Sequence, residues 1–296
     1  MKGFLNLTRR NSRLFFSDKG LFFSALITPM ILLVLYATFL ANVYHDSFVS
    51  ALPQGLPIPD DLIDATVGGQ LLSSLLAVSA VTVSFCCNML MVQDKTTGAV
   101  RDLRMTPVKP SVMALGYYTA TFLSSLLVCL IAAGAGFIYL ANTGWYMSAS
   151  DVMWVLIDLV VLVMFGTALS SVVNFFLTTQ GQISAVGTIV SSSYGFICGA
   201  YMPISNFPEW LQRVLSFLPG TYGTSVIRNH TLAGVFDEMA EVGFPADIVD
   251  KIRDSIDCNL YFFGERVSLS ASFAIIAGAA ALFILLYILE NKLAKK

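Results

Sequence analysis

Six charged side chains lie in one short polar stretch, QDKTTGAVRDLRMTPVKP (residues 93–110), between two long apolar segments. Thr96 or Thr97 can cap a helix whose body is Ala99–Met105, and Pro107 cannot continue that helix. The pattern therefore predicts a helix of about two turns that ends at a proline and is held between two apolar helices.

The charges of this short helix can make ionic contacts outside the chain. Arg101 and Arg104 share one helical face, with Asp102 beside them. Guanidinium groups bind phosphate and carboxylate oxygens, so this face could contact lipid headgroups or another protein. Pro110 can begin the next helix, because the N–H that proline lacks has no partner at that position.

One carboxylate, Asp158, lies well inside an apolar segment. A charge in lipid costs at least about 2.5 kcal/mol, so this group faces protein or water, or carries a proton. It could hydrogen-bond a neighbouring helix, or it could serve an ion- or proton-coupled carrier or a membrane enzyme. No second charge inside an apolar segment offers itself as a partner, and the residues leave both uses open.

Sequence motifs of catalysis are absent. The chain has no GxxxxGK[ST], HExxH, GxSxG or CxxC, so it has no phosphate-binding loop and no signature of a metalloprotease, serine hydrolase or zinc site. We expect no enzymatic activity, no metal and no cofactor bound by this chain. Cys258 is the one cysteine in a polar segment, and it could form a disulfide with a second copy.

The elements that position these residues are helices in a membrane. The 296 residues are 56% hydrophobic and 12% charged, with a mean hydropathy of +0.74. A soluble domain carries about twice that charged fraction, so most of this surface belongs in lipid. The sequence predicts an all-α integral membrane protein in a single domain, residues 1–296. Six spans are predicted, at about residues 21–43, 67–92, 112–141, 152–177, 183–201 and 268–289.

The distribution of basic residues predicts the orientation. Twelve of the 17 Lys and Arg residues precede span one, lie between spans two and three, or follow span six. Both termini are therefore expected in the cytoplasm. The segment of about residues 1–20, with Arg9, Arg10 and Arg13, is typical of an amphipathic helix in the cytoplasmic interface. A plain topology signal would explain the same residues.

Span five carries a stripe of small residues at intervals of four. A stripe of this kind lets another helix approach closely, within the subunit, along a dimer seam or beside a substrate path. Its members are Gly187, Ser191, Gly195 and Gly199.

Residues 202–267 lie outside the membrane in this topology and contain two short helical patterns, NFPEWLQRVLSFLP and TYGTSVIRNHTLAG. We expect Thr221 or Thr224 to cap the second helix and Gly234 to end it. Both helices are too short to cross a bilayer but apolar enough to re-enter it from outside.

Together these features resemble the permease subunits of ABC-2-type exporters, which share their fold with ABCG-type transporters. The stretch that begins QDKTTGAVRDLRMTPVKP is similar to the family's acidic–basic–x–x–Gly segment, which a short helix and span three follow. The two short helical patterns after span five and the basic N-terminal helix are also similar to the family. The chain departs from it in two ways. Its length and missing phosphate-binding loop lead us to expect no ATPase domain on the same chain, and its acidic stretch 237–266 is longer than in minimal members.

The resemblance implies a half-transporter. Two permease copies, a homodimer rather than a heterodimer, would work in the cell membrane with two cytoplasmic ATPase subunits that bind ATP and Mg²⁺. The exported substrate would be amphipathic or hydrophobic, such as a drug, a lipid or a lipid-linked glycan, and nucleic acid would have no part. A channel-like or scaffolding subunit is the remaining alternative.

The resemblance also implies roles for particular residues. The helix at 97–105 would be the coupling helix that docks on the ATPase, the N-terminal helix would be the connecting helix packed against it, and the turn 178–181 would make a smaller contact. The ATPase-coupling residues would be Thr97, Gly98, Arg101, Asp102, Arg104, Met105 and Pro107, and those of the connecting helix Arg9, Arg10 and Arg13. The substrate path or dimer seam would include Ser73, Ser74, Ser84, Gly187, Ser191, Tyr194 and Gly195.

Overall fold

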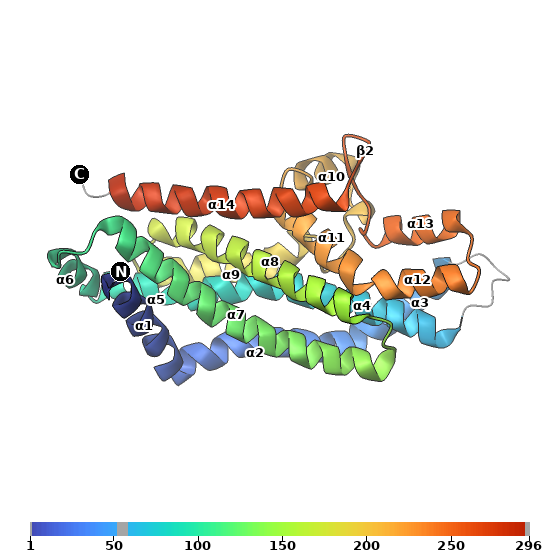
Figure 1. The fold of residues 1–296 in the computed structure, drawn as a ribbon, viewed down its shortest axis with the longest axis horizontal. Coiled ribbons are helices and arrows are strands. Elements are labelled where there is room, and N and C mark those ends of the chain that lie inside the picture. The colour runs from blue at the N-terminus through green and yellow to red at the C-terminus, as the bar shows by residue number, and fades with distance from the viewer. Residues whose placement is uncertain (1, 52–58, 294–296) are drawn as a thin grey trace.

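The computed structural model describes residues 2–51 and 59–293. Met1, residues 52–58 of the Pro-rich loop between the first two spans, and residues 294–296 lie outside the described residues. The described chain is almost entirely helical, with long helices lying side by side (Figure 1). The first helix, the end of the last helix and the short helix α6 lie at one end of this bundle (Figure 1). This end is the one that the sequence assigns to the cytoplasm.

Five helices in the described part of the chain are long and apolar enough to cross a membrane. The first crosses as α2, a short π-helical segment η1 and α3, and the second as α4 followed by α5. The protein is therefore a multi-pass, all-α membrane protein. The elements that build these spans are α2 (Lys19–Leu35), η1 (Tyr36–Leu40), α3 (Ala41–Ala51), α4 (Asp60–Cys87), α5 (Met89–Thr96), α7 (Pro110–Thr143), α8 (Ala149–Phe175) and α14 (Leu269–Leu293).

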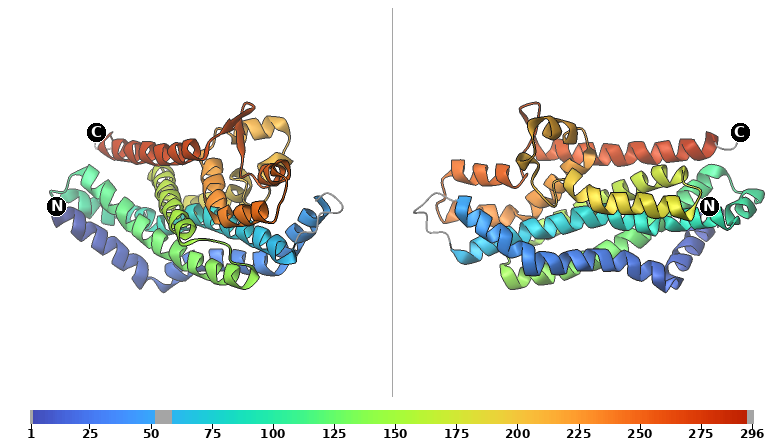
Figure 2. Two further views of the ribbon diagram at one scale, coloured as in Figure 1. Left: turned by 45° about the vertical axis from the view of Figure 1, so that its right-hand side comes forward. Right: turned by 180° about the vertical axis from the view of Figure 1, so that it is seen from behind.

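The expected span 183–201 corresponds to α9 (Gln180–Ile197), which is shorter and more polar than the five long helices. At 1.5 Å per residue its 18 residues measure about 27 Å. Seen from behind, α9 runs along α4 (Figure 2), and the two helices are in contact. A sixth span at this position stays a prediction.

Helix α4 forms the centre of the bundle. Every residue from Ala65 to Phe85 is buried, because α2, α7, α8, α9 and α11 (Pro219–Thr231) all contact this helix. Its apolar residues therefore surround the whole helix and form no single stripe. Helices α2 and α14 are mostly exposed, as expected for helices that face lipid.

The N-terminal amphipathic helix is present as α1 (Lys2–Ser17), and it packs against α7. Asp18 then caps α2, its carboxylate accepting a hydrogen bond from the Leu21 N–H at 3.0 Å. Further along this span, the π-helical segment η1 interrupts the α-helical hydrogen bonding. It precedes Tyr44, whose hydroxyl donates to the Tyr201 carbonyl after α9 at 2.9 Å.

The part of the chain that the sequence assigns to the outside, here called the outer part, contains both predicted short helices, although the second has other boundaries. Pro219 begins α11 and the helix ends at Thr231, so neither threonine is its cap and Gly234 lies inside the next helix. The acidic stretch folds into two further helices and a hairpin, which the sequence did not predict. These outer elements are η2 (Ile204–Asn206), α10 (Glu209–Leu215), α12 (Ala233–Glu241), α13 (Ala246–Ser255), β1 (Leu260–Phe262) and β2 (Glu265–Val267). Whether α10 and α11 re-enter the membrane stays a prediction.

Candidate functional site

The short charged helix forms where the sequence predicts it, as α6 (Ala99–Met105), but neither threonine caps it. The Thr97 hydroxyl donates to the Gln93 carbonyl, at the end of α5, at 2.9 Å. The cap of α6 is Gly98, whose φ of +84° lies in the left-handed region that glycine adopts without strain. The expected threonine cap is therefore wrong, and glycine makes the bend between α5 and α6.

Helix α6 projects from the end of the bundle. None of its residues is buried, and Met105 is 79% exposed. The other predicted coupling residues in and after this helix, Arg101, Asp102, Arg104 and Pro107, are also exposed. Pro110 begins α7 in its first turn, as predicted. The helix therefore presents its charges, and an apolar methionine side chain, to whatever lies beyond this end of the protein.

A buried carboxylate joins α1 to the helix before α6. The Arg10 guanidinium donates to the two oxygens of Asp94, at 2.6 and 3.1 Å, and the Tyr117 hydroxyl of α7 donates to Asp94 Oδ2 at 2.5 Å. The hydrogen bond to Asp94 raises the pKa of Arg10. Arg9 and Arg13 are exposed. Of the three predicted connecting-helix arginines, only Arg10 makes this contact.

The next residue, Lys95, holds the end of α8. Its ammonium group donates to the carbonyls of Asn174, Phe175 and Leu177, at 2.9, 2.6 and 3.1 Å. The last carbonyls of a helix lack partners within the helix and attract a cation. Asp94 and Lys95 thus connect the base of α6 to three helices, α1, α7 and α8. Sequence reasoning missed both residues as site residues, although they are the acidic–basic pair of the charged stretch.

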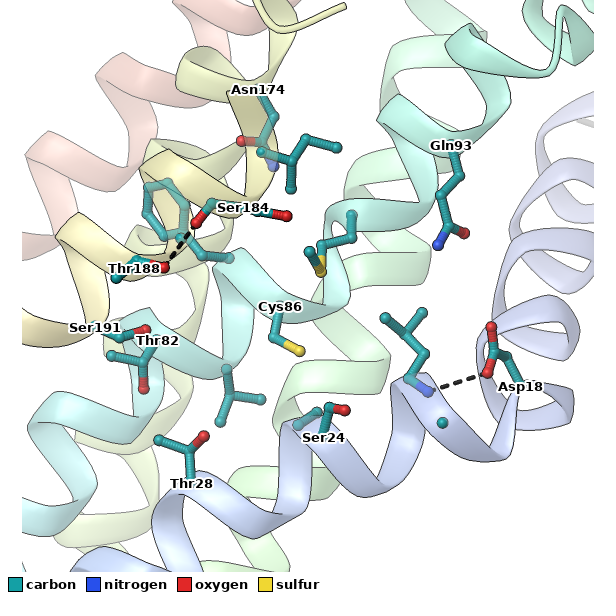
Figure 3. Close-up of a pocket in the computed structure, with 18 of the residues that line it drawn as sticks. Asp18, Ser24, Thr28, Thr82, Cys86, Gln93, Asn174, Ser184, Thr188 and Ser191 are labelled. Carbon is teal, nitrogen blue, oxygen red and sulfur yellow. Dashed lines mark hydrogen bonds between the residues drawn. The ribbon is translucent and has the colours of Figure 1, made fainter. Parts of the chain in front are cut away.

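A groove of about 820 Å³ opens where α2 and α9 flank α4 and α5 (Figure 3). Predicted path residues Gly187 and Ser191 line it from α9, opposite Ser24 and Thr28 of α2. The remaining lining residues are Asp18, Gly20, Leu21, Ala25, Thr82, Val83, Phe85, Cys86, Met89, Gln93, Asn174, Ile183, Ser184, Thr188 and Ser192. The volume suits a drug-sized molecule, and the lining mixes apolar groups with hydroxyl and amide groups.

Comparison with known protein families identifies the membrane domain. The sequence model of the ABC-2 type transporter family matches residues 2–231, from α1 to the end of α11. The chain belongs to the ABC-2 type transporter family. It is a membrane-spanning transport subunit of an ABC transporter, and this family normally works in a lipid bilayer with an ATPase partner. A search of curated proteins finds no significant match to the sequence.

In this ABC-2 permease, three of the predicted path residues face the inside of the subunit. Ser73 and Ser74 of α4 are buried and accept hydrogen bonds from Arg228 of α11, at 3.4 and 2.9 Å. Ser84 is buried as well, and its hydroxyl donates to the Ala80 carbonyl at 2.7 Å. These serines do not line the groove, because the buried α4 turns them toward its neighbours.

Tyr194 and Gly195, at the outer end of α9, also lie in the subunit interior of the permease. The ring of Tyr201 occupies the space where a side chain on residue 195 would point, so the glycine permits this turn of the chain. The stripe of small residues therefore divides into two parts. Gly187 and Ser191 face the groove, while Gly195 and Gly199 serve packing at its outer end.

Arg228 of the permease connects the outer end of α9 with the outer segments. Besides the two serines, it donates to the Gly199 carbonyl at 3.1 Å and to the Ile256 carbonyl. The Asp257 carboxylate lies 3.9 Å from the guanidinium group and accepts from the Ile204 N–H at 2.6 Å. Asp257 belongs to the part of the chain beyond the family match.

Asp158 has an ionisable partner that the sequence did not reveal. Its carboxylate lies 2.6 Å from His230 Nδ1 of α11, and the His230 ring stacks on Trp154. Asp158 is 2% exposed, and its other oxygen has no hydrogen-bond partner among the described residues. The contact between neighbouring helices agrees with the structural use that the sequence allowed.

Cys258 is buried and free, so a disulfide with a second copy finds no support here.

Proposed function

We propose that this chain is the permease of an exporter whose ATPase is a separate protein that docks on α6. The observation that carries the proposal is α6 itself, a charged helix without a buried residue at the end of the bundle. Its base is linked through Asp94 to α1 and α7 and through Lys95 to α8. A push on α6 therefore reaches three helices through hydrogen bonds of charged groups.

The rest of the proposal follows from the placement of α6. An ATPase that binds α6 lies in the cytoplasm, so α1 and the end of α14, which lie at the same end of the bundle, are on the cytoplasmic side of the cell membrane. Two permease copies face each other with their grooves between them and form the path of an amphipathic substrate. The open face of α9 supports a second copy at this place, because a side-chain carbon on Gly187 would meet no other part of the described chain within 4 Å.

The test is a charge reversal on α6. Arg101→Glu combined with Arg104→Glu should release the co-purifying ATPase and abolish ATP-dependent export, while the thermal stability of the permease stays the same because neither side chain is buried. The matched control replaces both arginines by lysine, which keeps the charge. If the glutamate variant keeps both ATPase association and export, α6 is not the docking helix. The permease alone should hydrolyse no ATP.

The pair of Asp158 and His230 provides an observation in favour of a second candidate, an ion- or proton-coupled carrier. A carrier of this kind needs the carboxylate, whereas a contact between helices needs only a hydrogen-bond acceptor. Asp158→Asn keeps an acceptor and removes the charge. We expect export by this variant to match the wild type. Transport that depends on an ion gradient and is lost in Asp158→Asn would favour the carrier instead.

A further inference from the structure

We propose that the groove between α2 and α9 selects positively charged amphiphiles, that is, molecules with a cationic centre attached to apolar groups. The inference rests on the proposed transport function, since it names the substrate class of the same groove. Three observations carry it. They are the one charge that lines the groove, the direction of three of its hydroxyl groups and one unpaired amide.

The groove carries a negative charge and no positive one among the described residues that line it. Asp18 is the charged residue, at the junction of α1 and α2, as Figure 3 shows. One of its oxygens accepts the capping hydrogen bond from the Leu21 N–H at 3.0 Å. The positive end of the α2 dipole offsets part of the charge. Among the described residues, no lysine, arginine or histidine lines the groove to neutralise the rest.

The basic side chains nearby in the structure are engaged elsewhere or do not line the groove. The Arg10 guanidinium binds Asp94, and the Lys95 ammonium binds the carbonyls at the end of α8. Lys19 is exposed but is not among the lining residues. An anionic headgroup in this groove would therefore find no cation, whereas a cationic one would find the Asp18 carboxylate.

Three of the seven hydroxyl groups that line the groove favour the same charge, whereas those of Ser24, Thr28, Ser184 and Ser191 donate to no group among the described residues and can serve a ligand of either charge. Thr188 donates to the Ser184 carbonyl at 2.8 Å, Ser192 to the Thr188 carbonyl at 2.9 Å, and Thr82 to the Val78 carbonyl at 3.0 Å. A hydroxyl has one hydrogen, so each of these groups is left with only acceptor capacity for a ligand. Acceptor oxygens attract a cation or a hydrogen-bond donor and repel an anion.

The amide of Asn174 adds one donor at the inner end of the groove. Asn174 is 1% exposed, and its Nδ2 has no hydrogen-bond partner among the described residues. A buried donor without a partner costs about 1–3 kcal/mol, and a carbonyl or ether oxygen of a ligand would supply the partner. The groove thus fits a cationic, largely apolar molecule that also carries one hydrogen-bond acceptor.

The test compares two probes of the same shape and opposite charge, tetraphenylphosphonium and tetraphenylborate. Binding of each is measured by equilibrium dialysis on the purified permease in a neutral detergent, so that no ATPase is involved. We expect the phosphonium to bind about tenfold more tightly, which corresponds to about 1.4 kcal/mol. Equal binding of the two probes, tighter binding of the borate, or binding of neither would overturn the proposal.

Two variants tie the preference to the groove. Asp18→Asn removes the charge but keeps a good helix cap, so the fold is preserved and the tenfold preference should disappear. Asp247→Asn makes the same change on the exposed surface of α13 and should leave the preference intact. Ser191→Trp fills the groove and should abolish binding of both probes. An unchanged preference in Asp18→Asn would also overturn the proposal.

The outcome is separable from that of the proposed function. Probe binding requires only the permease, and ATPase docking requires only α6. If the charge preference fails while the Arg101→Glu, Arg104→Glu variant still loses its ATPase, the substrate class is wrong and the transport function stands. If docking fails while the phosphonium preference holds, the groove binds cations for another purpose.

Discussion

Arg10, Asp94 and Tyr117 come from three different helices, and no pattern along the chain pairs them. Arg10 and Asp94 are 84 residues apart. The sequence does not distinguish Arg10 from Arg9 and Arg13, because all three are basic residues of one amphipathic helix. The packing of α1 on α7 decides which of them reaches the buried carboxylate. The sequence could therefore predict a basic interface helix but not its one ionic contact.

Arg10→Ala should destabilise the permease, because it leaves the buried Asp94 with the Tyr117 hydroxyl alone. Since the Arg10 side chain is 34% exposed, the loss should be modest, about 2 kcal/mol. Thermal unfolding in detergent measures the effect. Arg9→Ala changes an exposed arginine in the same helix and should leave the melting temperature unchanged. Equal melting temperatures for the two variants would show that the contact with Asp94 contributes no stability.

Asp257 makes the outer part of the protein sensitive to pH. Burial raises the pKa of Asp257 to about 6, although Arg228 and the N–H of Ile204 act in the opposite direction. An unfolded aspartate has a pKa of about 3.9, so the folded protein holds this proton more tightly than the unfolded chain does. The stabilisation is therefore fully present below about pH 4 and is lost as the pH rises through 6.

The pH dependence can be assigned with one substitution. Between pH 4.5 and 7.5, the wild type should lose about 2 kcal/mol more stability than Asp257→Asn, whose amide does not titrate. Thermal unfolding across this range measures the difference, and Asp247→Asn, an exposed carboxylate of α13, serves as the control. An Asp257→Asn variant with the wild-type pH profile would contradict this assignment.

At the scale of elements, the bounds of α6 follow from the sequence but its cap does not. Thr97 has a better partner in the Gln93 carbonyl of its own helix than in the amides of the next one. Gly98 then takes the left-handed bend, where nothing lies within 4 Å of the position a side chain would occupy. The bend therefore needs glycine for its backbone conformation and not for space.

Gly98→Ala should weaken coupling without unfolding the bundle. The left-handed conformation costs an L-residue about 1–2 kcal/mol, which acts on a helix that has no buried residue. We expect a several-fold decrease in ATP-dependent export and an unchanged melting temperature. Gly98→Asn is the control, because asparagine adopts the left-handed conformation more readily and should keep more of the export activity. Equal export by the alanine variant and the wild type would mean that the bend has no part in coupling.

At the scale of the whole molecule, the length of the apolar segments predicted five spans. The favourable free energy of transferring about 20 apolar residues into lipid outweighs most local preferences for other structure. Helix α9 is harder to predict, since its hydroxyl groups and two glutamines lower its hydropathy, and several of the hydroxyl groups line the groove. The inward direction of Ser73, Ser74 and Ser84 depends on the rotation of α4. A helix buried on all sides shows no amphipathic period from which that rotation could be read.

The arrangement of two copies can be tested with a cysteine on α9. In a Cys86→Ser background, Ser191→Cys should form a disulfide-linked dimer under mild oxidation, because the exposed face of α9 would meet its counterpart. Gel electrophoresis without reductant detects the product. Leu282→Cys, on the exposed face of α14, should stay monomeric if α14 faces lipid. A dimer that forms through position 282 and not through 191 would place the seam on α14 instead of α9.

The π-helical segment η1 has a consequence for comparing this chain with its relatives. A π turn contains one residue more than an α turn, so removing a single residue from Tyr36–Leu40 would restore a continuous α-helix. Because the wider turn absorbs the extra residue, the helix beyond it would keep nearly the same orientation. Tyr44 would therefore still face the Tyr201 carbonyl, and the contact between the first span and the end of α9 would survive. A one-residue gap at this point of an alignment is thus compatible with relatives whose outer end closes in the same way.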